Sequence, residues 1–241
     1  MTELEHSHEH GAIRARLKEE AKPSYVRDFV YGGIDGAITT FAVVAGVVGA
    51  ELSATIILIL GFANLLADGF SMAAANYSGT KTVIDDIARI RAIEKRHIAE
   101  APEGEREEVR QILAGKGLDG EVLETAVQRI TADQRQWINL MVTEEYGLSL
   151  VQPDPLKAGL MTFIAFALCG AIPLLPFALG MADAFTMSTV MTGLTFFGIG
   201  AVKSRWSLSH WLRSGLETLA IGGGAAMLAY VVGYLLKGLA G

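Results

Sequence analysis

The sequence predicts an all-α polytopic membrane protein with five transmembrane helices and a cytoplasmic helical insert between the second and the third. Hydrophobic residues make up 51% of the 241 residues, and the mean hydropathy is positive, which is typical of polytopic membrane proteins. Apolar runs of roughly 20 residues, the length that crosses a bilayer, recur along the chain. The expected spans are residues 27–49, 53–78, 156–180, 183–203 and 211–237.

The spans divide the chain into four parts. Residues 1–26 are expected to form a cytoplasmic tail and surface helix, and residues 27–79 the first two spans. Residues 80–152 form the insert, and residues 153–241 the last three spans. The N-terminal segment, the insert and the turn at 203–213 are rich in Lys and Arg. Because such basic flanks stay in the cytoplasm, we expect the N-terminus and the insert inside and the C-terminus outside.

Charge and cysteine content exclude several classes of protein. The net charge is −6, whereas a general nucleic-acid-binding surface needs clustered Lys and Arg. The single cysteine, Cys169, lies in an apolar run, so neither a disulfide framework nor a cysteine-based metal site is expected. The first 25 residues are charged and contain no apolar core, which argues against a cleavable signal peptide.

The N-terminal segment has two features. Residues 1–10 read MTELEHSHEH, and a tract of histidines among acids can gather divalent metal ions, although it is equally compatible with a tail that has no role. Residues 12–26 contain several basic residues followed by Pro23. We expect them to form a short amphipathic helix at the membrane surface.

The first span carries an acid, Asp35, inside its apolar run. A carboxylate at membrane depth costs about 2.5–3.5 kcal/mol on insertion scales, and such residues usually face a bundle interior or a water-filled path. Asp35 is therefore a candidate functional residue. Because it lies near the start of its span, it is also compatible with a position at the headgroup level, like Arg27 and Asp28 before it.

The second span carries a stripe of four residues spaced four apart, which places them on one face of a helix. Asp68 lies deeper in its span than Asp35 does, so an interfacial position explains it less well. Met72 alone is typical of core packing, and it becomes a candidate because it shares a face with Asp68. A partner surface must cover the stripe, and we expect two copies of this span to face each other. The stripe consists of Asn64, Asp68, Met72 and Asn76.

The insert is expected to contain four helices. The first, with apolar residues at helical spacing, should continue the second span and end at Pro102 and Gly104. The second should end between Gly115 and Gly117, the third should start after Asp119, and the fourth should close at Gly147. A domain of this size buries little core unaided, so we expect it to depend on a partner copy or on bound ions.

Three helices of the insert carry pairs of potential metal ligands at i, i+3 or i, i+4 spacing, so each pair points to one side of its helix. If these faces converge, they combine carboxylates with one imidazole and one thioether, a mixture that suits Fe²⁺ or Mn²⁺. Charge runs of this kind are also typical of solvated helix faces. The pairs are Glu94 and His97, Glu105 and Glu108, and Met141 and Glu145.

In the third span, Pro173 and Pro176 predict a kink, which neighbouring helices can accommodate. Glycine and alanine recur in the spans, as in Gly32, Gly33 and Gly36 of the first. Such small residues let helix backbones approach each other in lipid.

Three segments carry a resemblance to a known family: RDFVYGGIDGAITTFAVVAGVVGA, ANLLADGFSMAAANYSGTK and WINLMVTEEYGLSLVQPDPLKAGL. From Tyr25 onward the chain resembles the vacuolar iron transporter family in these segments and in having three spans after the insert. The resemblance implies a homodimeric exporter that moves Fe²⁺, and often Mn²⁺, out of the cytosol in exchange for protons, without a cofactor. It also implies transport roles for Asp35 and Met72 and metal binding by the six ligand candidates of the insert.

The chain departs from the family pattern at four positions. His97 lies where plant-type members have a glutamate, and Val142 lies where they have a second methionine. Asn64 replaces an acid, and Asp68 adds one a turn later. These differences leave the preference between Fe²⁺ and Mn²⁺ open.

The leading functional hypothesis is proton-coupled transport of divalent metal across a bacterial-type inner or plasma membrane rather than a vacuolar one. An intramembrane aspartyl protease also uses two acids on two spans, but its second acid lies in a GxGD motif, whereas LLA precedes Asp68 here. No HExxH zinc motif occurs either. A membrane-anchored metal sensor is a further alternative, although it leaves Asp68 and Met72 without a role.

Overall fold

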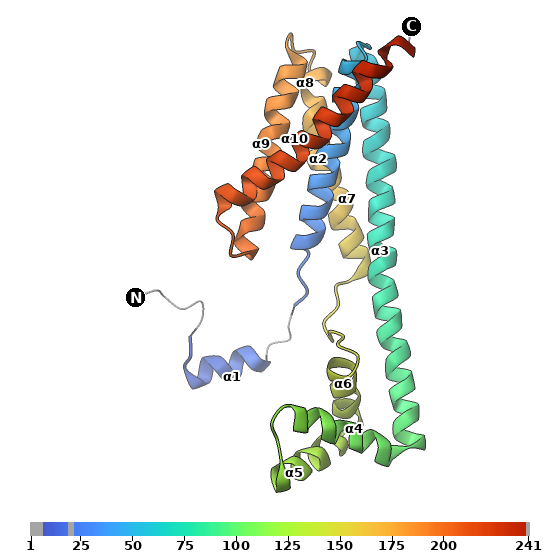
Figure 1. The fold of residues 1–241 in the computed structure, drawn as a ribbon, viewed down its shortest axis with the longest axis vertical. Helices are drawn as coiled ribbons and strands as arrows, with labels where there is room; N and C mark the ends of the chain where they lie inside the picture. The colour runs from blue at the N-terminus through green and yellow to red at the C-terminus, as the bar shows by residue number, and fades with distance from the viewer. Residues whose placement is uncertain (1–6, 19–21, 240–241) are drawn as a thin grey trace. The chain divides into compact units, whose positions relative to one another are not determined.

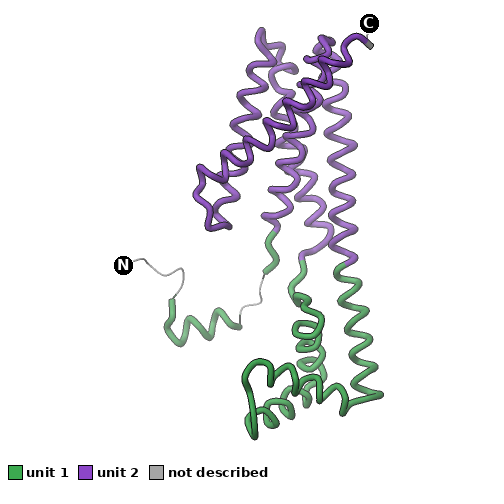
Figure 2. The backbone as a smooth tube through the Cα atoms, viewed as in Figure 1, with its two compact units in different colours: residues 1–24, 83–152 green, residues 25–82, 153–241 purple. Residues whose placement is uncertain are grey.

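The structure, a computed structural model, describes residues 7–18 and 22–239, and within these residues all regular elements are helical (Figure 1). Most of the histidine-containing tract, residues 1–6, lies outside the described residues. The chain divides into two compact units, one of residues 25–82 and 153–241 and the other of residues 1–24 and 83–152 (Figure 2).

Five helices are long and apolar enough to cross a membrane, which confirms the predicted fold class. The third of them changes from α to 3₁₀ geometry at Ile172–Leu174, the place where the sequence predicts a kink. The Ser188 hydroxyl donates a 2.7 Å hydrogen bond to the Pro173 carbonyl at this break. The five are α2 (Val26–Gly49), α3 (Ala54–Glu100), α7 with α8 (Pro155–Ala171 and Leu175–Ala178), α9 (Ala184–Lys203) and α10 (Trp211–Leu236).

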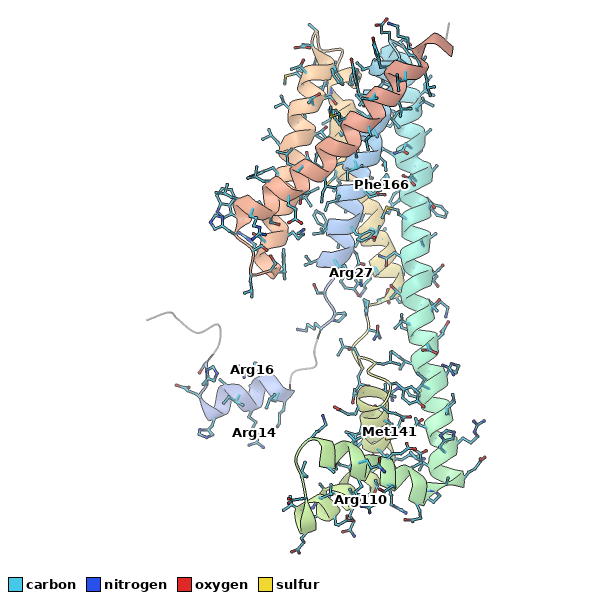
Figure 3. All side chains as sticks on the ribbon, viewed as in Figure 1. Arg14, Arg16, Arg27, Arg110, Met141 and Phe166 are labelled. Carbon is cyan, nitrogen blue, oxygen red and sulfur yellow. The ribbon has the colours of Figure 1, made fainter. Side chains whose placement is uncertain are left out.

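Glycines bring α2 and α7 into backbone contact. A Cβ atom added to Gly32 would lie 2.3 Å from the Thr162 carbonyl oxygen, and one added to Gly36 would lie 2.3 Å from that of Phe166. The Phe166 side chain is fully buried on α7, in a cluster with Phe41 of α2 (Figure 3). Small residues on α2 thus let the backbone of α7 approach closely.

The two ends of this unit are marked by contacts between distant segments. At one end, the Tyr25 hydroxyl accepts a 3.0 Å hydrogen bond from the backbone N–H of Asp154. At the other, Lys237 Nζ lies 2.6 Å from Oε1 of Glu51, so the end of α10 lies beside the turn between α2 and α3. If all five helices span the membrane, the turn after the first and the end of the fifth lie on the same side of it, which agrees with this contact.

The other unit contains most of the insert. The helix α3 continues without a break from its apolar part to Glu100, as the sequence predicts (Figure 1). The break falls at Ala101, whereas Pro102 and Gly104, where it was expected, both lie in the first turn of the next helix. A proline is tolerated there because its missing N–H would be unpaired in any case. The remaining helices are α4 (Pro102–Gly115), α5 (Gly120–Thr131) and α6 (Gln134–Glu144).

The helix expected at 12–26 is shorter than predicted. The helix α1 covers His10–Lys18, and residues 22–25 are not helical. Pro23 explains why Lys22 is not helical, because proline disfavours the helical conformation of the residue before it. The described residues of α1 bury no side chain.

Candidate functional site

A polar seam runs between α2 and α3, which pair in antiparallel register. We define this seam by three rungs, each joining a residue of α2 to a residue of the stripe on α3. Successive rungs are one to two helical turns apart on both helices. The rungs are Asp28 with Asn76, Asp35 with Asp68, and Thr39 and Thr40 with Asn64.

The middle rung consists of two carboxylates. Asp35 and Asp68 are both half-buried, and they lie close enough for their charges to repel each other. Gly36 and Gly69 follow them in the sequence, and both glycines lie against Phe166 of α7. The structure therefore places the two predicted intramembrane acids within electrostatic range of each other.

The two asparagines of the stripe are held by α2 and α7 of the same chain. Asn64 Nδ2 donates to the Thr39 hydroxyl at 3.1 Å. Asn76 Nδ2 donates to Oδ1 of Asp28 at 2.9 Å and to the Thr162 hydroxyl at 2.7 Å. The expectation that a second copy must cover the stripe therefore does not hold for these two amides. The glycine-lined face of α2 lets helices of the same chain reach them.

Met72 lies between the first two rungs on α3 and is half-buried. Its side chain packs against the apolar cluster that includes Phe166 and Leu65. This packing fits the core-filling interpretation, whereas its position one turn from both Asp68 and Asn76 fits the pathway interpretation. The geometry is compatible with both roles.

The insert gathers four glutamates from three helices. Glu94 on α3 and Glu105 on α4 are almost fully buried, at 1% and 5% exposed. The pKa of Glu105 is raised to about 7. Burial is the largest cause, and the charges of Glu94, Glu108 and Glu145 add to it. The pKa of Glu145, at the end of α6, is also raised, mainly by partial burial and further by the charges of Glu94 and Glu108. These mutual effects show that the four carboxylates lie near one another.

Two contacts orient this insert cluster. Oε1 of Glu94 accepts a 3.0 Å hydrogen bond from the Tyr146 hydroxyl, and Oε1 of Glu105 lies 3.3 Å from Nδ1 of His97. The second oxygen of each carboxylate, Oε2, is buried and has no hydrogen-bond partner. A buried, unpartnered carboxylate oxygen is costly unless a cation or a proton satisfies it.

Not every predicted ligand joins the cluster. Met141 is fully buried and packs against Val109 and Trp137 in an apolar cluster (Figure 3). Across the described part of the chain, no three His, Cys, Asp or Glu side chains are arranged so that they could hold a metal ion as they stand. The insert therefore presents an acidic cluster rather than a closed coordination shell.

A family model described as the VIT family matches residues 26–234. The chain belongs to the VIT family. Curated relatives are named vacuolar iron transporters: the protein from Arabidopsis thaliana is 36% identical over 210 residues, covering 85% of this chain and 83% of the relative. The protein from Toxoplasma gondii is 34% identical over 225 residues, with coverages of 88% and 74%. That from Plasmodium berghei is 28% identical over 244 residues, with coverages of 96% and 89%.

Membership of the VIT family confirms the resemblance and the expectation of a transporter rather than an enzyme. Two residues of this VIT-family chain escaped the sequence argument. Tyr146 has no charge and belongs to no periodic pattern of ligand residues. Its position directly after Glu145 was the only feature of the sequence that pointed to it. Asp28 lies seven residues before Asp35, which puts both on one helix face. This spacing could have identified Asp28 as a residue of the seam.

Proposed function

We propose that this chain exports divalent metal, Fe²⁺ and/or Mn²⁺, from the cytosol in exchange for protons. The observation that carries the proposal is the rung of Asp35 and Asp68 inside helices fit for lipid. Acids at this depth are retained where they face an ion path. The names of the relatives support iron as a substrate.

The same rung supports proton exchange. Two nearby carboxylates in a low-dielectric setting repel when both are ionised. A divalent cation between Asp35 and Asp68 relieves that repulsion, and in the proposed cycle a proton replaces the ion when it leaves. Metal and protons then alternate at one site, which is the basis of exchange.

The ligand chemistry supports Fe²⁺ and Mn²⁺ over Mg²⁺ and Ca²⁺. The Met72 thioether lies one turn from Asp68, and in the proposed path both contact the ion, with Asn64 and Asn76 as polar neighbours. Borderline-soft Fe²⁺ accepts sulfur, whereas Mg²⁺ and Ca²⁺ prefer oxygen alone. Selectivity would then come from the pair of Met72 and Asp68.

We further propose that residues 80–152 form a cytoplasmic domain that collects ions before transport. The unpartnered Oε2 atoms of Glu94 and Glu105 support this role. In this proposal the cluster side chains close around the ions, with His97, Glu108 and Glu145 as further ligands, and Met141 joins them by leaving its apolar cluster. Ligands on three helices would also add stability to a small domain.

Orientation, assembly and location complete the proposal. Basic flanks favour a cytoplasmic N-terminus and insert, with the C-terminus outside. The small core of the insert favours a homodimer. A bacterial-type inner or plasma membrane stays our prediction for the location, while the relatives are named for vacuoles.

The test is flux of Fe²⁺, Mn²⁺, Co²⁺ and Zn²⁺ into proteoliposomes with and without an imposed pH gradient. We expect Fe²⁺ or Mn²⁺ uptake that accelerates when the lumen is acidic, because outward protons then drive inward metal. Binding without flux would instead favour the metal sensor. Metal flux that does not depend on the pH gradient would contradict proton exchange.

A further inference from the structure

An apolar groove lies between α3 and α7, within the part of the chain that is fit to span a membrane. Its lining residues run from Phe70 to Tyr77 on α3 and from Leu156 to Phe163 on α7. Both stretches correspond to about 10 Å of helix. The volume of the groove is about 460 Å³, which falls in the range of roughly 300–1,000 Å³ that is typical of ligand sites.

Small residues create this groove. A Cβ atom added to Gly159 would lie 2.8 Å from the Ala73 carbonyl oxygen, so the backbones of α3 and α7 meet at the floor (Figure 1). Ala74 keeps the wall on α3 low. The large side chains at the two ends stay open to the surroundings, with Phe70 69% and Leu156 70% exposed. The result is a hollow between α3 and α7 rather than a flat lipid-facing surface.

One end of the groove lies at the boundary between membrane and water. Leu156 belongs to the first turn of α7. On α3 the apolar run ends at Tyr77, and residues 78–82 read SGTKT. Tyrosine is enriched at membrane interfaces, where its ring lies at the level of the lipid headgroups. The groove therefore runs from the headgroup level into the hydrocarbon region.

Two exposed lysines flank this boundary end. Lys81 follows Tyr77 by one turn of α3, and Lys157 precedes Leu160 by one turn of α7. Lys81 also interacts within the chain, whereas the amine of Lys157 has no hydrogen bond or ion pair with any residue of 7–18 or 22–239. Asp154, close to it in sequence, caps α7 by accepting the backbone N–H of Lys157 at 2.9 Å. The Lys157 amine is therefore available to an anion.

The combination of an apolar groove with cations at its boundary end matches an anionic phospholipid. Basic pockets between membrane-spanning helices are a known way to bind lipid headgroups. A second copy of the chain matches less well, because a two-fold interface brings the same patch of both copies together. Lys81 and Lys157 would then face the same lysines at the same depth, and opposed like charges are costly.

We propose that this groove binds one anionic phospholipid. An acyl chain lies along the floor formed by Ala73 and Gly159, and Lys157, with Lys81 beside it, holds the phosphate. The bound lipid joins α3 to α7 and stabilises their contact. This inference goes beyond the proposed transport function and does not depend on it.

The experiment compares phosphatidylglycerol with phosphatidylcholine of the same acyl chains. The full chain in detergent is titrated with each lipid, native mass spectrometry counts the bound lipids, and thermal unfolding measures the stabilisation. We expect one phosphatidylglycerol to bind more tightly than phosphatidylcholine. Near saturation it should raise the melting temperature by about 5 °C or more.

Two variants test the two parts of the site. Lys157→Gln should weaken phosphatidylglycerol binding about fivefold, the effect of one basic residue beside a lipid headgroup, and Lys157→Arg should retain the binding. Arg213→Gln, at an exposed residue in the first turn of α10, is the control for charge. Ala74→Phe fills the groove and should abolish the stabilisation by phosphatidylglycerol. Ala220→Phe, at an exposed alanine of α10, is the control for the added ring.

Three results would overturn the proposal. Equal binding of the two lipids by the unmodified chain would indicate an ordinary lipid-facing surface. Phosphatidylglycerol binding that survives both Lys157→Gln and Ala74→Phe would place the lipid elsewhere. Dissociation of an oligomer by Ala74→Phe in size-exclusion chromatography, with lipid binding unchanged, would assign the groove to a second copy. If Ala74→Phe does not fold, Lys157→Gln decides, and binding equal to that of Arg213→Gln would overturn the proposal. None of these measurements uses transport, so failure of metal exchange is a separate result.

Discussion

The hydroxyl of Tyr146 donates a 3.0 Å hydrogen bond to Oε1 of Glu94, 52 residues earlier in the chain. The contact joins the end of α6 to α3 at a carboxylate that is 1% exposed. The pKa of Tyr146 is raised to about 12, mainly by burial and further by the hydrogen bond to Glu94. The phenol therefore stays protonated at physiological pH and remains a donor to Glu94.

Removing this donor should destabilise the insert. Tyr146→Phe leaves Glu94 buried with both oxygens unpartnered, which should lower the free energy of unfolding by about 1–3 kcal/mol. Denaturant unfolding of the metal-free full chain measures this loss. Tyr31→Phe removes a hydroxyl from an exposed tyrosine of α2 and is the control. Equal stability of the two variants would mean that the hydrogen bond contributes nothing.

The raised pKa of Glu105 predicts a pH dependence of stability. Its pKa is about 7 in the folded protein, against a usual value of 4.5, so the folded state binds the proton more tightly. The stability that this proton contributes is fully present below the pKa of Glu105 in the unfolded chain. It is lost as the pH rises through the pKa of Glu105 in the folded protein. The melting temperature of the metal-free chain should therefore fall between about pH 5 and pH 7.5.

Glu105→Gln should flatten that fall, because the amide does not ionise. Glu121→Gln, an exposed acid on α5, should leave it unchanged. Because a metal ion must displace the proton, metal affinity should rise over the same pH range. A melting temperature that rises with pH in the metal-free chain would contradict this assignment.

The insert cluster should account for metal binding outside the membrane. Changing Glu94, Glu105, Glu108 and Glu145 together to glutamine should abolish the ion-induced rise in melting temperature and most of the binding heat. The matched control changes Glu103, Glu107, Glu121 and Glu124, four exposed acids of the same insert. Calorimetry on the full chain compares the two. Similar losses in both would indicate only diffuse attraction to acidic surface.

Met72→Leu tests sulfur separately from packing, because the two side chains have similar volumes. We expect Fe²⁺ flux to fall and discrimination against Mg²⁺ to narrow, while folding is retained. Competition of Mg²⁺ with Fe²⁺ in proteoliposomes measures the change. If selectivity is unaltered, the contacts of Met72 with the apolar cluster are its whole role.

The sequence predicted the parts of the fold that depend on local signals. Five spans and the unbroken α3 follow from apolar length and helical periodicity. Periodicity on one helix identifies a face but not what covers it, which is why Asn76 was expected to face a second copy. Its actual partners, Asp28 and Thr162, are 48 and 86 residues away in the chain.

The candidate site shows the same limit. Spacing pairs Glu94 with His97 and Glu105 with Glu108, because i, i+3 neighbours share a helix face. It also paired Met141 with Glu145, yet Met141 points into an apolar cluster formed with Val109. Which way a buried methionine turns depends on tertiary packing, which helical spacing does not encode.

The central claim is that metal crosses the membrane at Asp35 in exchange for protons. The most direct measurement records Mn²⁺ uptake and lumenal pH together in proteoliposomes, for the unmodified chain and for Asp35→Asn. We predict that the unmodified chain takes up Mn²⁺ while the lumen loses protons. The folded, inserted Asp35→Asn variant should do neither, because an amide cannot alternate between a cation and a proton. Normal Mn²⁺ uptake by that variant would contradict the account.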